Sequence, residues 1–281
     1  PIISSTVLLL SLMLLASPVW GQVGDTGKYV SINDMEMYYE VHGQGEPLVL
    51  LHGFLASGRL WDPVVEKLAS SYQIIVPDMR GHGKSTNPSK EFTHRQSAHD
   101  IYALLDHLGI ERFKALGISS GGMTLLHMAT QQDDRLESMV LIGSTIYFPE
   151  QARAIMEQTS YDKRDGPTWS WVEQFQSRGD EQVQMLFDQF HGFKDSFDDM
   201  NFTAPLLSTI TAQTLIVHGD RDAFFPLDIP VLMNSSIPNS YLWIVPNGGH
   251  APIFDSMLPH FLETTTKFLQ EEWGVPFMSG E

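Results

Sequence analysis

One serine in this sequence stands in a pattern typical of a nucleophile. It is Ser119 in Gly117-Ile118-Ser119-Ser120-Gly121, which matches G-x-S-x-G at the end of an apolar run and at the start of an amphipathic stretch. This context predicts a strand, a sharp turn and a helix, with the serine exposed at the turn. Both glycines are needed, because the strand and helix backbones come close there and leave no space for a Cβ.

A serine hydroxyl is a weak nucleophile at neutral pH, so it needs a base, and the base needs an acid that orients it. His250 is the candidate base, because it follows the last predicted strand in the glycine-rich loop Gly248-Gly249-His250. Two carboxylates, Asp220 and Asp222, follow the preceding strand. We favour Asp222 as the acid, because a carboxylate directly after a strand-ending glycine more often bonds its own backbone. The chain order serine, acid, histidine agrees with this assignment.

Acyl transfer also needs N–H donors for the oxygen that becomes negatively charged. The loop His52-Gly53-Phe54 follows an early strand, and the backbone N–H groups of Phe54 and Ser120 are the predicted donors. His52 has a competing interpretation as a metal ligand or second base, but no H-E-x-x-H pattern accompanies it, so we assign it a structural role. The chain has no cysteine, which excludes a thiol nucleophile, and the motifs imply no metal or organic cofactor.

The elements around these motifs predict an α/β fold. Short β-branched runs alternate with longer amphipathic stretches, which is typical of a mostly parallel sheet flanked by helices. Residues 28–32 and 35–40 predict an antiparallel hairpin at one edge of the sheet. The predicted core strands are residues 47–51, 73–77, 113–117, 138–142, 214–218 and 241–245.

The strand pattern stops between Thr145 and about Leu207, where aromatic residues and methionines gather. We interpret residues 146–207 as a small helical cap inserted between two core strands. The core then consists of residues 22–145 and 208–281. The aromatic side chains of the cap either form its own small core or contact an apolar portion of a substrate.

The N-terminal residues and the charge indicate where the protein acts and what it binds. Residues 1–21 contain an apolar stretch that ends before a proline and a small residue, which predicts a signal peptide and a secreted or periplasmic protein. A retained hydrophobic anchor is the alternative. The net charge of −17 would repel nucleic acid and anionic membranes, so we expect a small-molecule partner, no nucleic acid and no stable membrane insertion after signal cleavage.

Together these motifs resemble the α/β-hydrolase superfamily, in particular its esterase, lactonase and haloperoxidase-like branch with a small inserted cap. The resemblance covers nearly everything from Tyr29 to Trp273. Besides the serine motif it includes the HGF, DMRGHGKS, GDRDAFFP and GGH segments. The family pattern places the acid three residues after the strand-ending glycine, at Asp222.

The resemblance implies a serine hydrolase that cleaves an ester or lactone through an acyl-enzyme on Ser119. Haloalkane dehalogenases and epoxide hydrolases share the layout but use an aspartate nucleophile, and position 119 is serine. A carbon–carbon bond hydrolase, a haloperoxidase-like enzyme and a non-catalytic ligand-binding protein of the same fold are the alternatives. The spacing alone does not separate them.

Overall fold

The core of the molecule is a sheet built from short apolar strands. The structure is a computed structural model that describes residues 27–132, 134–163 and 166–273, so the predicted signal peptide, residues 1–21, lies outside the described residues. Within them, eight strands form one sheet in the order β1-β2-β4-β3-β5-β6-β7-β8. In chain order the strands are β1 (Lys28–Ile32), β2 (Met35–His42), β3 (Glu46–Leu51), β4 (Tyr72–Pro77), β5 (Phe113–Ile118), β6 (Leu136–Ile142), β7 (Gln213–Gly219) and β8 (Ser240–Val245).

The sheet is parallel except at one edge, as the sequence predicts. Strands β1 and β2 pair antiparallel, β2 pairs antiparallel with β4, and the remaining neighbours are parallel. The turn between β1 and β2 places Asn33 and Asp34 at φ 42° and 62°. Positive φ at both central residues is what a two-residue type I′ hairpin turn requires, and asparagine and aspartate tolerate it well. The predicted α/β fold class is confirmed.

Helices cover both faces of the sheet and fill the long connections between strands. Short 3₁₀ turns are η3 (Gly58–Trp61), η4 (Tyr161–Lys163), η5 (Phe193–Asp195) and η6 (Asp255–Met257). The α-helices are α1 (Asp62–Leu68), α2 (His94–His107), α3 (Ser120–Gln131), α4 (Glu150–Gln158), α5 (Gly166–Glu173), α6 (Asp180–Gly192), α7 (Ala204–Leu207), α8 (Asp228–Ser236) and α9 (Leu258–Leu269).

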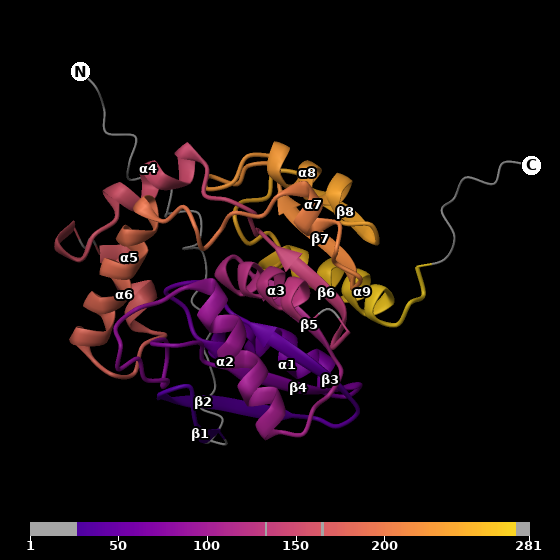
Figure 1. The fold of residues 1–281 in the computed structure, drawn as a ribbon, viewed down its shortest axis with the longest axis horizontal. Coiled ribbons are helices and arrows are strands. Elements are labelled where there is room, and N and C mark those ends of the chain that lie inside the picture. The colour runs from indigo at the N-terminus through magenta and orange to yellow at the C-terminus, as the bar shows by residue number, and fades with distance from the viewer. Residues whose placement is uncertain (1–26, 133, 164–165, 274–281) are drawn as a thin grey trace, which may run out of the picture.

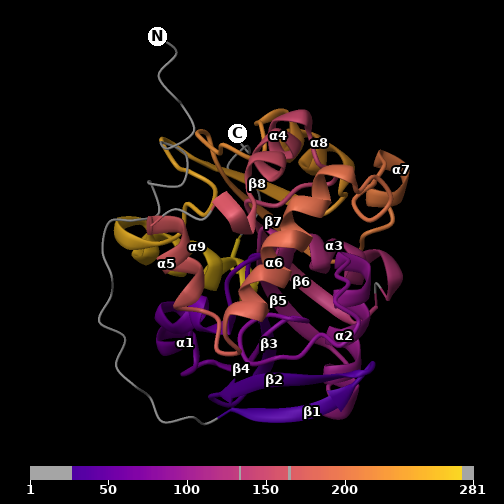
Figure 2. The same ribbon diagram turned by 90° about the vertical axis from the view of Figure 1, so that its left-hand side faces the viewer.

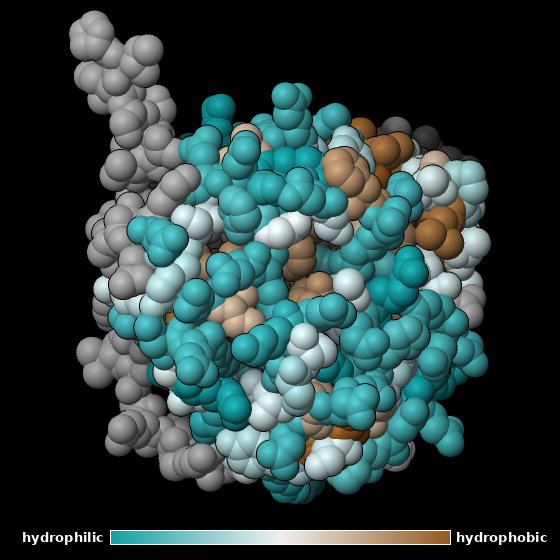
Figure 3. All heavy atoms as spheres, turned by 60° about the vertical axis from the view of Figure 1, so that its left-hand side comes forward, coloured by the Kyte–Doolittle hydropathy of each residue, from teal (hydrophilic) through white to brown (hydrophobic). Residues whose placement is uncertain are grey.

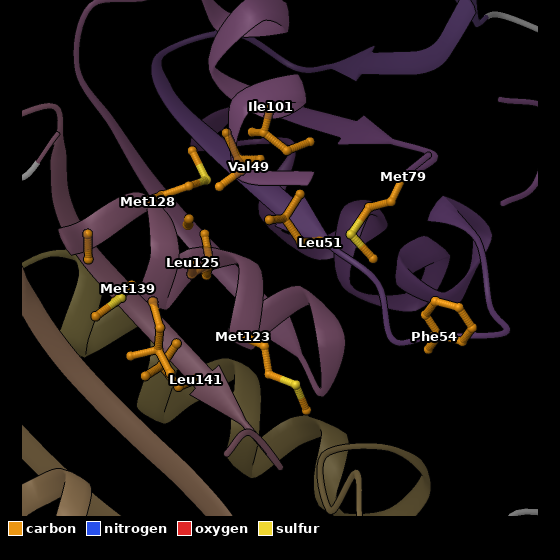
Figure 4. Close-up of a cluster of buried hydrophobic side chains, with 14 of the residues drawn as sticks. Val49, Leu51, Phe54, Met79, Ile101, Met123, Leu125, Met128, Met139 and Leu141 are labelled. Atoms are coloured by element: carbon orange, nitrogen blue, oxygen red, sulfur yellow. The ribbon is translucent and has the colours of Figure 1, made fainter. Parts of the chain in front are cut away.

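Alternate side chains of the core strands enter two separate hydrophobic clusters, one on each face. In β3, Val49 and Leu51 belong to the cluster under α2, α3 and α8, whereas Leu48 and Leu50 belong to the cluster under α1 and α9. Figure 4 shows the first cluster, where Val49 and Leu51 lie with Ile101 of α2 and with methionines and leucines of α3 and β6. A strand buried on both faces has few polar residues, which explains its continuous apolar run in the sequence.

The chain between β6 and β7 leaves the sheet and forms helices α4 to α7. Figures 1 and 2 show α4, α5 and α6 grouped together beside the sheet, on the side where β5 and β6 end. We call residues 146–207 the inserted segment. In open α/β sheets ligands bind beyond the carboxyl ends of the strands, so this segment lies next to the expected position of a site. None of the helices in the described ranges is long and apolar enough to cross a membrane.

Candidate active site

Ser119 occupies the sharp turn between β5 and α3. Its backbone has φ 51° and ψ −116°, which non-glycine residues rarely adopt. Its N–H donates to the carbonyl oxygen of Ile142 in β6 at 2.8 Å. A Cβ at Gly117 would lie 2.5 Å from the Gly121 carbonyl carbon, and a Cβ at Gly121 would overlap the Leu51 carbonyl oxygen. The reason that the sequence suggests for both glycines, lack of space for a Cβ, is therefore confirmed.

A chain of two hydrogen bonds connects Ser119 to an acid through a histidine. Nε2 of His250, in the loop after β8, lies 2.9 Å from Ser119 Oγ. Its Nδ1 lies 2.8 Å from Oδ2 of Asp222, in the loop after β7. A carboxylate at Nδ1 holds the proton on that nitrogen and leaves Nε2 free to accept the serine proton. This geometry suits nucleophilic attack by Ser119 assisted by a general base.

The surroundings of Asp222 keep its carboxyl group ionised. Oδ1 accepts hydrogen bonds from the backbone N–H groups of Phe224 and Phe225, at 2.7 and 3.2 Å. Burial alone would raise the pKa of Asp222, but the charge and hydrogen bond of His250, the charge of His218 and the Phe224 N–H together lower this pKa. The acid is thus a charged, fully hydrogen-bonded partner for the imidazolium that forms during catalysis.

Asp220, the other candidate acid, lies in the same loop but takes no part in the hydrogen bonds that link Asp222, His250 and Ser119. Its described ion pair is with the neighbouring Arg221, with Nε and Oδ1 3.9 Å apart. The backbone turn bond expected of Asp220 is instead made by Asp222, whose Oδ1 bonds N–H groups two and three residues ahead. The turn bond predicted for Asp220 is therefore wrong, although the structure does bring Asp222 to His250.

The two predicted oxyanion donors belong to residues in segments next to Ser119. Ser120 is the next residue and the first of α3, and a Cβ built on Gly53 would lie 3.6 Å from the Ser119 Cβ, so the loop that carries Phe54 runs beside the nucleophile. In the described part of the chain, neither the Phe54 nor the Ser120 N–H donates to another group. Both N–H groups thus have no described hydrogen-bond partner.

His52 joins two loops through both of its ring nitrogens. Nδ1 lies 2.8 Å from the Gly53 carbonyl oxygen, and Nε2 accepts the Met79 N–H at 3.0 Å, so Nδ1 is the protonated nitrogen. Burial lowers the pKa of His52 to about 4 although its hydrogen bond to Gly53 favours the charged form. The contacts support the structural role that the sequence suggests.

Replacement of His52 by leucine should destabilise the protein by about 1–3 kcal/mol near neutral pH, because the buried Met79 N–H loses its acceptor. Between the unfolded pKa of 6.5 and the folded pKa of about 4, the unfolded chain binds a proton at His52 that the folded chain does not. The stabilisation by His52 is therefore complete above this window and decreases as the pH falls through it. Urea unfolding should therefore show that the difference in unfolding free energy between the wild type and His52→Leu shrinks as the pH falls, by up to about 1.4 kcal/mol per pH unit. A difference that does not change with pH would contradict the assignment.

Sequence reasoning missed the side-chain contact of Ser120, which was expected to contribute only its backbone N–H. Ser120 Oγ lies 3.0 Å from Nε2 of His94, and Nδ1 of His94 lies 2.6 Å from Oδ2 of Asp199. His94 and Asp199 belong to no recognised motif and are separated by 105 positions in the chain. No signal in the sequence connects them with the serine motif.

Aromatic rings extend from the base to the oxyanion loop. The ring of Phe224 lies 4.7 Å from that of His250 and 6.4 Å from that of Phe190, and Phe190 stacks at 6.0 Å on Phe54. The ring of Phe193 is 4.9 Å from that of Phe54. Figure 3 shows hydrophobic side chains near the centre of the face turned to the viewer, set among hydrophilic ones. The inserted segment therefore contributes Phe190 and Phe193 to a row of rings that includes Phe54 of the predicted oxyanion loop.

Other aromatic rings of the inserted segment pack on one another. Trp169 stacks on the buried Phe187 at 5.8 Å, and Trp171 contacts Phe175 at 4.9 Å. These rings form part of the segment's own core. Phe190 and Phe193 instead contact Phe54 of the core, and whether they also contact a substrate stays a prediction.

A sheet of this topology with a serine at the turn after β5 defines the α/β-hydrolase class. Residues 46–178 match the family described as the alpha/beta hydrolase fold. The chain is therefore similar to this family over residues 46–178, it has the α/β-hydrolase fold, and it is an enzyme.

Proteins that are similar to this chain in sequence have different activities. A soluble epoxide hydrolase from Corynebacterium sp. (strain C12) is 36% identical over 111 residues, which cover 40% of this chain and 39% of the relative. A pimeloyl-(acyl-carrier protein) methyl ester esterase from Aliivibrio salmonicida is 26% identical over 260 residues, which cover 84% of this chain and 97% of the relative.

Among solved structures, a meta-cleavage product hydrolase from Pseudomonas fluorescens IP01 matches with a TM-score of 0.73 and 21% identity, over 88% of this chain and 98% of that one. At this level of identity the likeness shows the fold. The reaction has to be argued from the residues of this chain.

Proposed function

We propose that this protein is a serine hydrolase that cleaves a carboxylic ester or lactone. The observation that carries the proposal is the continuous chain of hydrogen bonds from Asp222 through His250 to Ser119, at 2.8 and 2.9 Å. Epoxide hydrolases of this layout use an aspartate nucleophile, and this chain has serine at position 119, so we do not propose epoxide opening.

In the proposed reaction His250 removes the proton of Ser119 as Oγ attacks the carbonyl carbon of the substrate. The N–H groups of Phe54 and Ser120 stabilise the negative charge on the carbonyl oxygen. His250 then donates its proton to the leaving alkoxide, which produces an acyl-enzyme and an alcohol. A water molecule deprotonated by His250 releases the acid, and Asp222 stabilises the imidazolium in both steps.

The inserted segment acts as a cap in this proposal and selects substrates with an apolar portion. Phe190 and Phe193 of the segment and Phe224 of the core place apolar rings beside His250 and the oxyanion loop. Burial of an acyl methylene among such rings is favourable by about 0.8 kcal/mol, which corresponds to a factor of about four in affinity. The substrate class is therefore an ester whose acyl or alcohol part is aliphatic or aromatic.

A series of p-nitrophenyl esters of increasing acyl length tests this proposal. We expect KM to decrease by up to about fourfold per methylene until the apolar space is filled. A fluorophosphonate probe should label the protein once, and peptide mass spectrometry should place the label on Ser119. Failure to hydrolyse any ester or lactone, together with absence of labelling, would refute the function.

A matched pair of phenylalanine variants tests the contribution of the cap. Phe190→Ala should reduce the gain per methylene, because Phe190 lies between Phe54 and Phe224. Phe187→Ala removes a ring that stacks on Trp169 inside the segment, so it should lower stability and keep the dependence on acyl length. The opposite pattern would mean that Phe190 does not contact the substrate.

A further inference from the structure

A second chain of hydrogen bonds with the same residue types ends on the neighbour of the nucleophile. Asp199 Oδ2 accepts the Nδ1–H of His94 at 2.6 Å, and His94 Nε2 lies 3.0 Å from Ser120 Oγ. The His94 side chain is fully buried and Ser120 is 3% exposed. A buried chain whose members all have partners is costly to break and therefore holds its geometry.

Asp199 is the charged residue at one end of this series of hydrogen bonds. Its carboxylate also accepts the backbone N–H groups of His94 and Arg95, at 2.8 and 3.1 Å, and so binds the first turn of α2. Burial alone would raise the pKa of Asp199, but the hydrogen bonds and charge of His94 with the Arg95 N–H lower this pKa to about 2. An ionised Asp199 fixes the proton of His94 on Nδ1 and the orientation of the ring.

The hydrogen bonds of Asp199, His94 and Ser120 join three elements that are far apart in the sequence. Asp199 comes from the inserted segment, His94 from the start of α2 and Ser120 from the start of α3. Ser120 directly follows Ser119, whose strained backbone persists only where its surroundings hold it in place. The bond to His94 is one such constraint, and it acts on the residue whose N–H is a proposed oxyanion donor.

We infer that His94 and Asp199 are positioning residues that act through Ser120 Oγ and hold the Ser120 N–H where the oxyanion forms. This role rests on the proposed function. It also means that the inserted segment is connected to the oxyanion hole by side chains, so the placement of the cap and the alignment of an oxyanion donor depend on each other.

The first test compares two histidine-to-leucine variants. In His94→Leu we expect kcat for p-nitrophenyl esters to fall by about 10- to 100-fold, because the oxyanion donor is displaced rather than deleted. KM should change less than twofold, since the donor acts on charge that develops in the transition state. The control is His127→Leu, in α3. His127 Nε2 also contacts Asp199, at 2.8 Å from its carbonyl oxygen and 3.6 Å from its Oδ1, and among the described residues it forms no hydrogen bond with Ser120.

A transition-state analogue gives a readout that a purely structural role would not change. A trifluoromethyl ketone forms an adduct with Ser119 whose oxyanion occupies the hole, so its inhibition constant in His94→Leu should rise by the factor by which kcat/KM falls. In His127→Leu the inhibition constant should stay near the wild-type value. Equal changes in both variants would overturn the inference.

A double-mutant cycle tests whether His94 acts through Ser120. Ser120→Ala removes Oγ and keeps the N–H, so it should reproduce the loss of kcat seen in His94→Leu. The double variant should then be no slower than either single variant. Effects that multiply, or a folded Ser120→Ala enzyme with full activity, would overturn the inference even if His94→Leu did not fold. Absence of any Ser119-dependent turnover in the wild type would instead refute the proposed function.

Discussion

Replacement of Ser119 by alanine is expected to reduce kcat for ester hydrolysis by about 10⁶-fold, the loss that follows removal of the nucleophile from a Ser-His-Asp site. The loss is large because the acyl-enzyme can no longer form, and His250 then has no hydroxyl to activate. The fold should survive, because alanine at position 119 removes one oxygen and leaves the backbone of the turn unchanged. Steady-state kinetics and thermal unfolding of the purified variant check both statements.

The matched control for Ser119→Ala is Ser138→Ala. Ser138 lies in β6, is 4% exposed, and its Oγ has no hydrogen-bond partner among the described residues. Its replacement also removes a single serine hydroxyl, so we expect wild-type kcat. If Ser119→Ala retained substantial activity while Ser138→Ala behaved as the wild type, Ser119 would not be the nucleophile.

Replacement of Asp222 by asparagine should have the second largest effect, a decrease in kcat of about 10⁴-fold. Asparagine keeps the size of the side chain and removes its charge. The imidazolium of His250 then loses its stabilising partner, and the Nδ1 proton is no longer held in place. KM should change little, because Asp222 acts in the transition state and does not bind the substrate directly.

Asp220→Asn is the matched control, because it makes the same chemical change two residues away in the same loop. Asp220 forms its described ion pair with Arg221 and no described hydrogen bond with His250, so we expect kcat to stay within about twofold of the wild type. The pair of variants decides between the two carboxylates that the sequence leaves open. A large loss in Asp220→Asn with little loss in Asp222→Asn would reassign the acid.

The elements of the fold were predictable because their signals are local. Each core strand is a short apolar run that the sheet buries on both faces, as Val49 and Leu50 of β3 show by entering opposite clusters. The hairpin turn was predictable from Asn33 and Asp34, which tolerate positive φ. The order of the strands in the sheet and the position of the inserted segment beside it depend on packing between distant elements, which no local pattern encodes.

The nucleophile and the base were predictable for a related reason. The turn after β5 requires glycine at two positions, so the backbone itself leaves a signature around Ser119. His250 lies in a glycine-rich loop after the last strand, and the order serine, acid, histidine along the sequence restricts which residues can be its partners. The acid was harder, because Asp220 and Asp222 share one loop and differ only in where their side chains point. The turn-bond reason for choosing Asp222 was incorrect, whereas the family pattern also points to Asp222, which contacts His250.

Residue order alone therefore established the α/β class, the strands and the serine turn, because each of these depends on contacts between neighbouring residues. Three-dimensional packing decided which carboxylate meets His250, 28 positions away, and brought Asp199 to His94 across 105 positions. Such contacts require side chains from separate loops to meet at hydrogen-bond distance. That distance is set only when the sheet, its helices and the inserted segment pack together.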